Sequence, residues 1–568
     1  MSSHLRTVRQ WLGDWTLSGG LVLAVIFLAL GIVWPLLRML ALSLSPEGLA
    51  EFAVVLGRGT FQRIAINTLV MGAAVATLGT GLAFLFAFVQ VWVNVPFKRL
   101  LHWIALLPII SPPFAVALAV ISLFGRSGLI TYRLFGLRYD IYGLDGLTLV
   151  LSLSFFPAAY IGLLGMMRAL NPALDEAAIN LGASRWHVFR TVTVPILVPG
   201  ILGSFLLLFV EAMADLGNPL ALGGDFTVLA SRIYIAIIGE YDMIAGAVLS
   251  VNLLVPTLAL FLAQNYIVNR KSYVTVTGKP AGTPRLISSP FARWSLFAAV
   301  ASVAALIVLI YGTVLVGAFT RLFGIDYSFT LDNFKFVLFG YGSQAMVTTV
   351  ILAGIAMPIA ALIGTLVAYL VTRKQFPGRN ALDFASMLGL AVPGTVLGIG
   401  YVLAYNQPIE VAGITLLPKL AGGAGLLGGA AVIVLSFAAR SMPASVRNGT
   451  ATLQQIDPVL EEASLNLGAD NGTTFRRITL PLIRPAVLSG MIYAFARSMT
   501  SLSSIIFLTT PYTKIMVAQI FTEADAGRFG NAFAYCVILI AIVLVAIALL
   551  YRVIGSTTGA EREASLGG

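Results

Sequence analysis

Two acidic residues in one apolar stretch are the side chains of this sequence best suited to chemistry. Glu211 and Asp215 lie four positions apart, so a helix places them on one face. An ionised side chain costs about 2.5–3.5 kcal/mol at the bilayer centre on insertion scales, and such residues usually serve a function. Hard cations prefer oxygen ligands, so a transient contact with a metal ion is one hypothesis. The alternative is that the two acids pair within the bundle or lie near the outer water.

A basic residue occupies the matching place in the second half of the chain. Arg497 lies 286 positions after Glu211, and Ser501 follows Asp215 by the same interval. Neither charge is tolerable alone in a membrane span, so we expect Glu211 and Arg497 to face the interior of a translocation pathway and to approach or pair when the pathway is closed. Asp215, Ser501 and Ser503 would lie nearby on the outer side. Alternatively, each charge finds a different partner, or one side chain snorkels to the outer interface.

The elements that must position these residues are membrane helices. The chain is 58% hydrophobic and only 10% charged, whereas soluble domains carry roughly 25% charged residues. Apolar stretches of twenty or more residues recur along it, which is typical of helical membrane proteins and unlike the short alternating segments of a barrel. We expect an all-α membrane protein with about twelve transmembrane helices, near residues 20–43, 66–91, 100–124, 147–167, 196–218, 243–267, 295–319, 346–371, 381–405, 425–439, 482–507 and 531–551.

The charge distribution predicts an orientation. A net charge of +11 could suggest nucleic acid, but basic residues concentrate in alternate loops, as the positive-inside rule requires of cytoplasmic segments. Both termini are therefore expected in the cytoplasm, and no nucleic-acid partner is expected. The single cysteine and three dispersed histidines form no metal-binding motif. The basic residues assigned to the inside include Arg168, Arg185, Arg190, Arg373, Lys374, Arg379, Arg440 and Arg447.

The sequence also repeats itself. Residues 171–199 align without a gap with residues 457–485, and six predicted spans separate the two copies. Because six is even, both copies face the same side, so the repeat is parallel with a pseudo-twofold axis along the membrane normal. We expect a six-helix module at 1–267, a basic cytoplasmic linker at 268–293 and a second six-helix module at 294–568.

Each copy predicts a helix, a glycine turn and a second helix. Asn171 and Asp457 are good N-cap residues, and each precedes a proline that suits the first helical position. Gly182 and Gly468 end a helix of about ten residues, because glycine adopts the left-handed conformation without strain. A second short helix follows in each copy. Its expected caps are Ser184 and Asp470, and Pro195 and Pro481 are expected to mark the return to the membrane.

This repeated segment resembles the EAA loop of binding-protein-dependent transport permeases. The copies read Glu176-Ala177-Ala178 with Gly182 and Glu462-Ala463-Ser464 with Gly468. The second copy departs from the family by its serine, and the first by a Val-Pro pair where Leu-Pro is usual. The resemblance implies a type I ABC importer permease fold, in which each loop docks on one ATPase subunit. The residues it assigns to this docking are Glu176, Ala177, Gly182, Glu462, Ala463 and Gly468.

The resemblance also implies the partners. The chain has no phosphate-binding loop, so it is expected to be no enzyme and to hold no cofactor, with ATP and Mg²⁺ on two copies of a separate ATPase subunit. A periplasmic substrate-binding protein would dock on the outer loops near 125–146, 219–242 and 508–530, where Arg126, Arg133 and Arg138 would suit acidic residues. The expected location is the bacterial inner membrane.

Within the family, the chain is most similar to the fused ferric-iron permeases. The similar stretches are residues 214–219, 223–226, 273–279 and 498–508. Thiamine and aminophosphonate permeases share the fused layout and remain alternatives for the substrate. Two other classes would be an ion-coupled secondary transporter, which predicts no pair of EAA loops, and a membrane enzyme, for which no catalytic cluster is visible.

Overall fold

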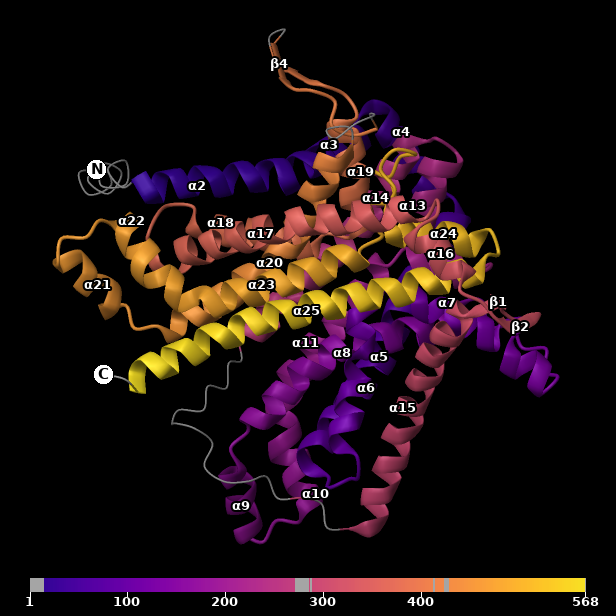
Figure 1. Ribbon diagram of the computed structural model, residues 1–568, viewed down its shortest axis with the longest axis horizontal. Helices are drawn as coiled ribbons and strands as arrows, with labels where there is room; N and C mark the ends of the chain where they lie inside the picture. The colour runs from indigo at the N-terminus through magenta and orange to yellow at the C-terminus, as the bar shows by residue number, and fades with distance from the viewer. Residues whose placement is uncertain (1–14, 271–285, 287–288, 412–413, 423–428, 567–568) are drawn as a thin grey trace. The chain divides into compact units, whose positions relative to one another are not determined.

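The protein is almost entirely helical (Figure 1). The computed structural model describes residues 15–270, 286, 289–411, 414–422 and 429–566. Within this part of the chain ten helices are long and apolar enough to cross a membrane, and a pair bent by 105° would make eleven. The prediction of an all-α membrane protein is confirmed, and most of the predicted linker at 268–293 lies outside the described residues.

Two of the predicted spans are broken by prolines. The predicted span at 100–124 forms α6 (Lys98–Ile110) and α7 (Pro113–Phe124). The predicted span at 381–405 forms α18 (Arg379–Ala391) and α19 (Gly394–Tyr405), which is the pair bent by 105°. A proline lacks the N–H of the helical ladder and forces the preceding residue out of the helical region, so Pro112 and Pro393 each separate two helices.

The predicted span at 425–439 was wrong in its limits. Helix α20 runs over Ala431–Gln455, so Arg440 and Arg447 lie inside this helix. The two arginines interrupt the hydropathy of the sequence, and α20 is therefore absent from the ten apolar helices. It packs between α17 (Ser343–Arg373) and α23 (Leu480–Thr500), which lets it carry polar residues on faces turned to protein.

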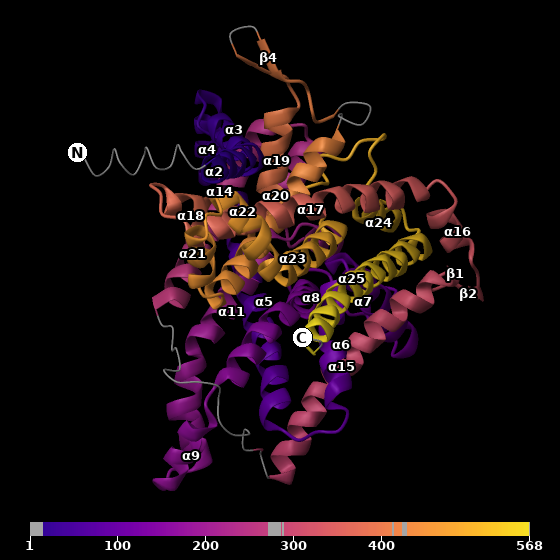
Figure 2. The same ribbon diagram turned by 60° about the vertical axis from the view of Figure 1, so that its left-hand side comes forward.

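The helices form two compact units. Unit 2 comprises residues 46–340 and 520–537. Its centre is the packing of α5 (Gly59–Trp92) on α8 (Leu144–Ala169) and α11 (Val194–Ala214), visible in Figures 1 and 2. Gly79 permits the close approach, because a Cβ there would collide with Leu208 of α11. The unit also holds α4 (Pro46–Gly57), η2 (Leu129–Leu134), α9 (Pro172–Asn180), α10 (Arg185–Val188), η3 (Phe189–Thr193), α12 (Gly217–Leu222), α13 (Leu229–Tyr234), η4 (Ile235–Gly239), α14 (Met243–Arg270), α15 (Pro290–Ala318) and α16 (Asp332–Leu338).

Unit 1 comprises residues 1–45, 341–519 and 538–568. Helices α17, α20 and α23 lie side by side at its centre. The remaining elements include α2 (Trp15–Leu28), η1 (Ala29–Val33), α3 (Trp34–Ser43), α21 (Val459–Asn466), α22 (Asn471–Thr474) and η6 (Phe475–Thr479). The last two helices, α24 (Met516–Asp525) and α25 (Phe529–Leu566), contribute residues to both units.

The first helix of each half belongs to the unit built by the other half. Helix α3 packs on α19, and α2 packs on α17 and α18, all within unit 1. Helix α15, the first after the linker, packs on α5, α6 and α7 within unit 2. The module boundaries at 267 and 294 describe the sequence repeat and stay a prediction. The compact units differ from these modules, because each unit contains the first helix of the other half of the chain.

Two tyrosines fix the exchanged first helix in unit 1. The hydroxyl groups of Tyr401 and Tyr405 each donate a hydrogen bond of 2.6 Å, to the carbonyl oxygens of Gly31 and Leu30 respectively. Pro35 has no N–H for the carbonyl four residues earlier, that of Gly31, and the chain widens there into the π-helical turn η1. Side chains of α19 thus satisfy backbone groups that the helix itself leaves open.

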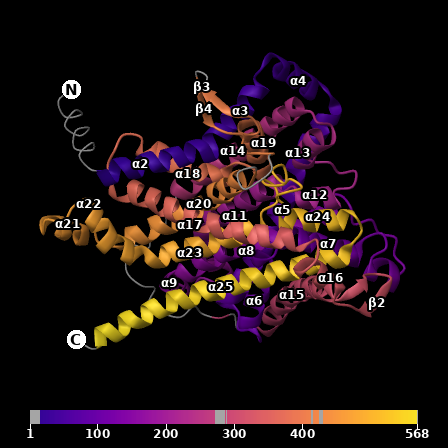
Figure 3. The ribbon, with the colours of Figure 1, turned by 45° about the horizontal axis from the view of Figure 1, so that its top comes forward.

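Two short hairpins lie in the connections and were not predicted. Strands β1 (Thr320–Leu322) and β2 (Asp326–Phe329) pair antiparallel after α15, and Figure 3 shows β2 beside α15 and α16. Strands β3 (Ile409–Val411) and β4 (Ile414–Leu417) pair antiparallel after α19. In unit 2 the β1–β2 turn is anchored by Phe323, whose ring centroid lies 5.7 Å from that of Phe533.

Candidate functional site

The first EAA loop has the local structure that its sequence predicts. Helix α9 begins after Asn171, whose Oδ1 accepts a hydrogen bond of 3.1 Å from the backbone N–H of Ala173. Gly182 follows the helix with φ +91°, a left-handed conformation. The hydroxyl oxygen of Ser184 then accepts from the backbone N–H of His187 and caps α10. The predicted helix, glycine turn and second helix are confirmed.

The second loop repeats this geometry. Oδ1 of Asp457 accepts a hydrogen bond of 3.0 Å from the backbone N–H of Val459, at the start of α21. Gly468 has φ +90°. Asp470 caps α22 through the backbone N–H groups of Gly472 and Thr473. These hydrogen bonds, that of Thr473 foremost, hold the pKa of the Asp470 carboxyl below its ordinary value.

Neither loop is separated from its membrane span. Residues 185–214 and 471–500 each form one continuous helix, so Pro195 and Pro481 do not begin a new one. In both copies a π-helical turn, η3 or η6, stands directly before the proline pair. A proline removes one hydrogen bond and crowds the carbonyl four residues earlier, and the wider turn accommodates both effects. Each span is therefore continuous with the second short helix of its loop.

The two loops expose matching side chains. Leu181 and Leu467, which are repeat mates, are each 89% exposed. Leu174 and Leu460 are also exposed mates. The docking residues that the family resemblance indicates are exposed in both copies: Glu176, Ala177, Gly182, Glu462, Ala463 and Gly468. Each loop thus presents leucines and a glutamate to whatever covers it.

An arginine anchors the second loop to the membrane helices of unit 1. Arg373, the last residue of α17, donates hydrogen bonds of 2.9 and 2.7 Å to the carbonyl oxygens of Leu453 and Ile456. Its Nε lies 3.3 Å from Oε1 of Glu461 in α21, an ion pair without hydrogen-bond alignment. The two side chains are only 10% and 13% exposed. Thr479 also donates to Glu461, at 3.0 Å.

Aromatic rings anchor the first loop. Trp92 is the last residue of α5, and Arg373 is the last residue of α17. Each lies four residues before a proline. The ring of Phe88 lies 5.1 Å from that of Trp92 and 5.7 Å from that of Phe189, which stacks on Trp186. Figure 2 shows α9 at the lower end of unit 2. Figure 1 shows α21 beyond the left-hand ends of α20 and α23 in unit 1.

The predicted pathway residues lie where the spans end. Asp215 is the C-cap of α11 and accepts hydrogen bonds of 3.0 and 2.9 Å from the backbone and side-chain nitrogens of Asn218. Its mate Ser501 is the C-cap of α23. Glu211 and Arg497 belong to different compact units. Their approach, and a contact of Glu211 or Asp215 with a metal ion, therefore stay predictions.

The structure adds one residue to this region that the sequence analysis had placed elsewhere. Arg440 of α20 donates a hydrogen bond of 3.2 Å from Nη1 to the hydroxyl oxygen of Ser503. Gly394 makes room for the guanidinium, because a Cβ there would collide with it. Among the described residues, no three histidine, cysteine, aspartate or glutamate side chains gather as a metal site would require. The signal that could have revealed Arg440 was its place in the polar face of a helix that starts at Ala431.

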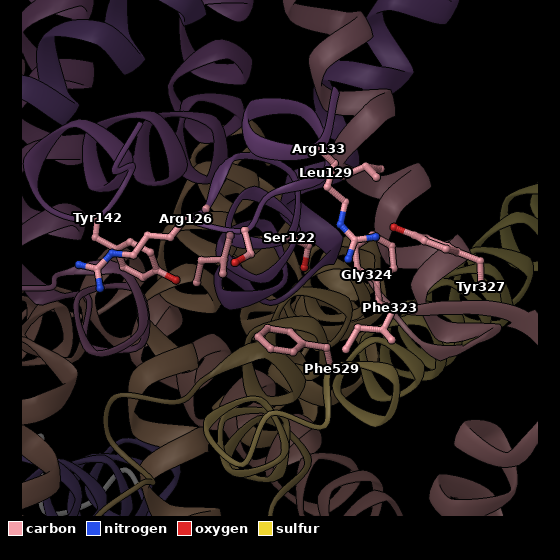
Figure 4. Close-up of a pocket in the computed structure, with 13 residues that line it drawn as sticks. Ser122, Arg126, Leu129, Arg133, Tyr142, Phe323, Gly324, Tyr327 and Phe529 are labelled. Atoms are coloured by element: carbon pink, nitrogen blue, oxygen red, sulfur yellow. The ribbon is translucent and has the colours of Figure 1, made fainter. Parts of the chain in front are cut away.

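A basic pocket of about 340 Å³ lies in unit 2, among the loops predicted to face the periplasm. Figure 4 shows Arg126 and Arg133 on either side of Ser122, with Tyr327 and Gly324 of the β1–β2 hairpin at one side. Arg126 stacks over the ring of Tyr142 at 5.2 Å and pairs with Asp140 at 2.9 Å. This hydrogen-bonded pairing lowers the pKa of the Asp140 carboxyl.

Comparison with known proteins finds one family that matches both halves of the chain. Residues 79–273 and 360–557 each match the family described as binding-protein-dependent transport system inner membrane component. The chain is 34% identical over 570 residues to the ferric transport system permease protein FbpB of Actinobacillus pleuropneumoniae, with 96% of this chain and 79% of the relative covered. It is 35% identical over 483 residues to the putative ferric transport system permease protein FbpB 1 of Haemophilus influenzae, covering 81% and 72%.

A third relative matches over the whole length. The chain is 26% identical over 574 residues to the probable ABC transporter permease protein y4fN of Sinorhizobium fredii, covering 97% of both chains. The family match occurs once in each half, so the internal repeat is shown by comparison as well as by sequence. The chain is therefore a multi-pass membrane permease that belongs to the binding-protein-dependent transport system inner membrane components.

Proposed function

We propose that this chain is the fused, two-module permease subunit of an ATP-driven importer that moves ferric iron from a periplasmic binding protein to the cytoplasm. The observation that carries the proposal is the pair of EAA loops, which share one backbone geometry and expose the same side chains within one polypeptide. The ferric-transport names of two relatives that align with most of the chain support the substrate.

Each loop suits a soluble ATPase subunit. The exposed leucines at 174, 181, 460 and 467 offer apolar contacts, and Glu176 and Glu462 offer negative charge beside them. An apolar centre with charged residues around it is typical of protein interfaces. One ATPase copy on each loop, with ATP and Mg²⁺ bound there, would supply the driving force. The loops and both termini then lie in the cytoplasm, as the distribution of basic residues predicts.

Charge reversal on the loops tests the docking. Glu176→Lys and Glu462→Lys should each weaken ATPase binding by about tenfold, because like charges replace opposite ones across the interface. The measurement is titration of the purified ATPase onto the permease in lipid nanodiscs. The matched control is Glu47→Lys, which reverses the charge of an exposed glutamate outside both loops, in α4. Wild-type binding by both loop variants would refute the docking role.

The basic pocket is the proposed docking surface for the binding protein. Arg126 and Arg133 line it, and Arg138 lies in the same loop. Acidic residues on the partner would compete with Asp140 for Arg126, since an exposed ion pair contributes little and exchanges readily. Arg126→Glu with Arg133→Glu should abolish stimulation of ATP hydrolysis by the iron-loaded binding protein and leave basal hydrolysis unchanged. Unchanged stimulation would refute this surface.

The pathway proposal rests on the symmetry of the repeat. Glu211 and Arg497 are mates in α11 and α23, and their pairing would close the pathway. Either Glu211→Gln or Arg497→Gln should impair transport, since a charge left without its partner in a membrane span is costly. The exchange of Glu211→Arg with Arg497→Glu should restore part of the transport. Wild-type uptake by both single variants would exclude the pair.

The substrate is tested by uptake into liposomes. Permease, ATPase and binding protein are reconstituted together and offered radioactive ferric ion, thiamine or an aminophosphonate. The proposal predicts ATP-dependent uptake of ferric ion alone. Uptake of thiamine or an aminophosphonate would keep the machinery and change the cargo. Uptake driven by an ion gradient without ATPase would overturn the proposal.

A further inference from the structure

A deep apolar groove lies in unit 2 beside the first EAA loop. Its volume is about 820 Å³. Three segments form its walls: the end of α5, the stretch from α9 to η3, and the start of α15. Aromatic and aliphatic side chains dominate the lining, among them Phe88, Trp92, Trp186, Phe189, Phe291 and Leu296.

We expect the groove to lie at the level of the membrane surface. Helices of 34 and 29 residues, such as α5 and α15, are roughly 51 and 44 Å long at 1.5 Å per residue, whereas the hydrocarbon core is about 30 Å thick. Their ends therefore reach the headgroup region. Tryptophans gather there, as is typical of this interface: Trp92 ends α5, Trp186 is 69% exposed, and Trp294 is 52% exposed.

The groove also has a polar, positive mouth. Arg185, Ser289 and Ser295 line it together with the apolar residues, and all three are exposed. The first residues of α15 form part of the mouth. This N-terminus is the positive end of the dipole of a 29-residue helix. An apolar interior below a cationic mouth, placed at the membrane surface, matches a lipid with a negative headgroup.

We propose that this groove binds an anionic phospholipid, with an acyl chain against Phe88 and Leu296 and the phosphate at Arg185. A soluble partner fits less well, because Phe88 lies four residues inside the end of α5 and Leu296 six residues inside the start of α15. The lipid would contact Trp186 and Phe189, the same rings that anchor the first loop. Lipid binding would thereby steady one of the two loops.

The repeat places this site in the first half of the chain. Asn471 and Gly472 stand at the positions that match Arg185 and Trp186, so the second copy of the loop has neither the guanidinium nor the indole. The bound lipid is thus expected to act on the first loop and not on its mate. This inference concerns the permease alone, and its test needs neither the ATPase nor the cargo.

The test is retention of lipid by the full-length permease. The protein is equilibrated in micelles that contain equal amounts of phosphatidylglycerol and phosphatidylethanolamine, and bound lipids are counted by native mass spectrometry. The wild type should retain phosphatidylglycerol preferentially. Ala292→Trp, which fills the groove from α15, should reduce that retention at least fivefold. Arg185→Gln should reduce it about fivefold, the effect of one arginine beside an anionic headgroup, and remove the preference.

A matched substitution controls for the new indole. Ala305 is exposed on the same helix, nine residues beyond Leu296, so Ala305→Trp should leave retention unchanged. If Ala292→Trp fails to fold, Arg185→Gln carries the test. Equal retention of the two lipids by the wild type would overturn the proposal. So would unchanged retention in Ala292→Trp, the result expected if another part of the chain or the ATPase fills the groove.

Discussion

The two EAA loops have the same backbone conformation but differ in the contacts that hold each loop to its membrane helices. Both have an Asx cap, a left-handed glycine and a π-helical turn at matching positions. The second loop is tied to its membrane helices by the nearly buried ion pair of Arg373 with Glu461. The first is held by the rings of Phe88, Trp92, Trp186 and Phe189.

The difference shows which features the shared role constrains. The surface presented to a partner is the same in both loops, since Leu181 and Leu467 are equally exposed and Glu176 and Glu462 occupy the same place. The contacts that hold each loop to its own membrane helices differ, an ion pair in the second copy and an aromatic cluster in the first. We infer that the two loops respond differently to mutation and to acid while they bind the same partner.

Removal of Arg373 should have the largest effect, and only on the second loop. Arg373→Met leaves the Glu461 carboxylate, 13% exposed, without its cation and frees two backbone carbonyls. A broken buried pair costs about 3–5 kcal/mol, so the opening free energy of residues 457–479 should fall by about 3 kcal/mol in hydrogen exchange. Arg373→Met with Glu461→Leu should recover part of this loss. Equal loosening of residues 171–193 would contradict the separate anchors.

Truncation of Phe88 is the reciprocal experiment. Phe88→Ala removes the ring that contacts both Trp92 and Phe189. Loss of a fully buried phenylalanine costs about 3–5 kcal/mol, and Phe88 is only half-buried, so about 2 kcal/mol is expected. Hydrogen exchange should show faster opening of residues 185–193 and no change in the second loop. An effect on both loops would mean that one scaffold holds them together.

Substitution of the glycines should affect the two loops alike. Gly182→Ala and Gly468→Ala each force a side chain into a conformation near φ +90°, which costs about 1 kcal/mol. Stimulation of ATP hydrolysis should fall by a similar factor in each variant, and asparagine at either position should be tolerated better. A large effect at one glycine alone would show that the docking surfaces are not equivalent.

Acid should produce the smallest difference. Asp470 caps α22, whereas the neutral hydroxyl of Ser184 caps α10. The pKa of Asp470 is lowered in the folded protein, chiefly by its hydrogen bond with Thr473. Its contribution is therefore present above the ordinary aspartate pKa of 3.8 and is lost as the pH falls below that value. Exchange of residues 471–474 should accelerate in this range, and Asp470→Ser should remove the acceleration.

The parts of the fold that sequence predicted are those that local chemistry decides. The cap Asn171 and the left-handed glycines follow from short-range hydrogen bonds and sterics, and they are confirmed. Asp457 makes the same hydrogen bond two residues along, although the N-cap of α21 is Pro458. The sequence did not reveal that Pro112 and Pro393 each divide a predicted span into two helices. Hydropathy averages over such breaks, because it responds to composition and not to hydrogen bonding.

Features that depend on distant contacts could not be predicted. The charge of Arg373 and Arg440 predicted a side of the membrane but not their contacts: Arg373 bonds to α20 and α21, and Arg440 lies within a helix beside Ser503. The exchange of the first helices is likewise invisible in sequence, since hydropathy identifies α2 and α15 but not the unit each one joins. Both features require the positions of partners far along the chain.

The central claim is that one chain carries two equivalent docking loops for an ATPase. The most direct measurement is the mass of the complex that the permease forms with its ATPase in detergent, determined by native mass spectrometry. We predict two ATPase copies per chain for the wild type and one copy for either Glu176→Lys or Glu462→Lys. A wild-type complex with a single copy, or two copies retained when both glutamates are reversed, would contradict the account.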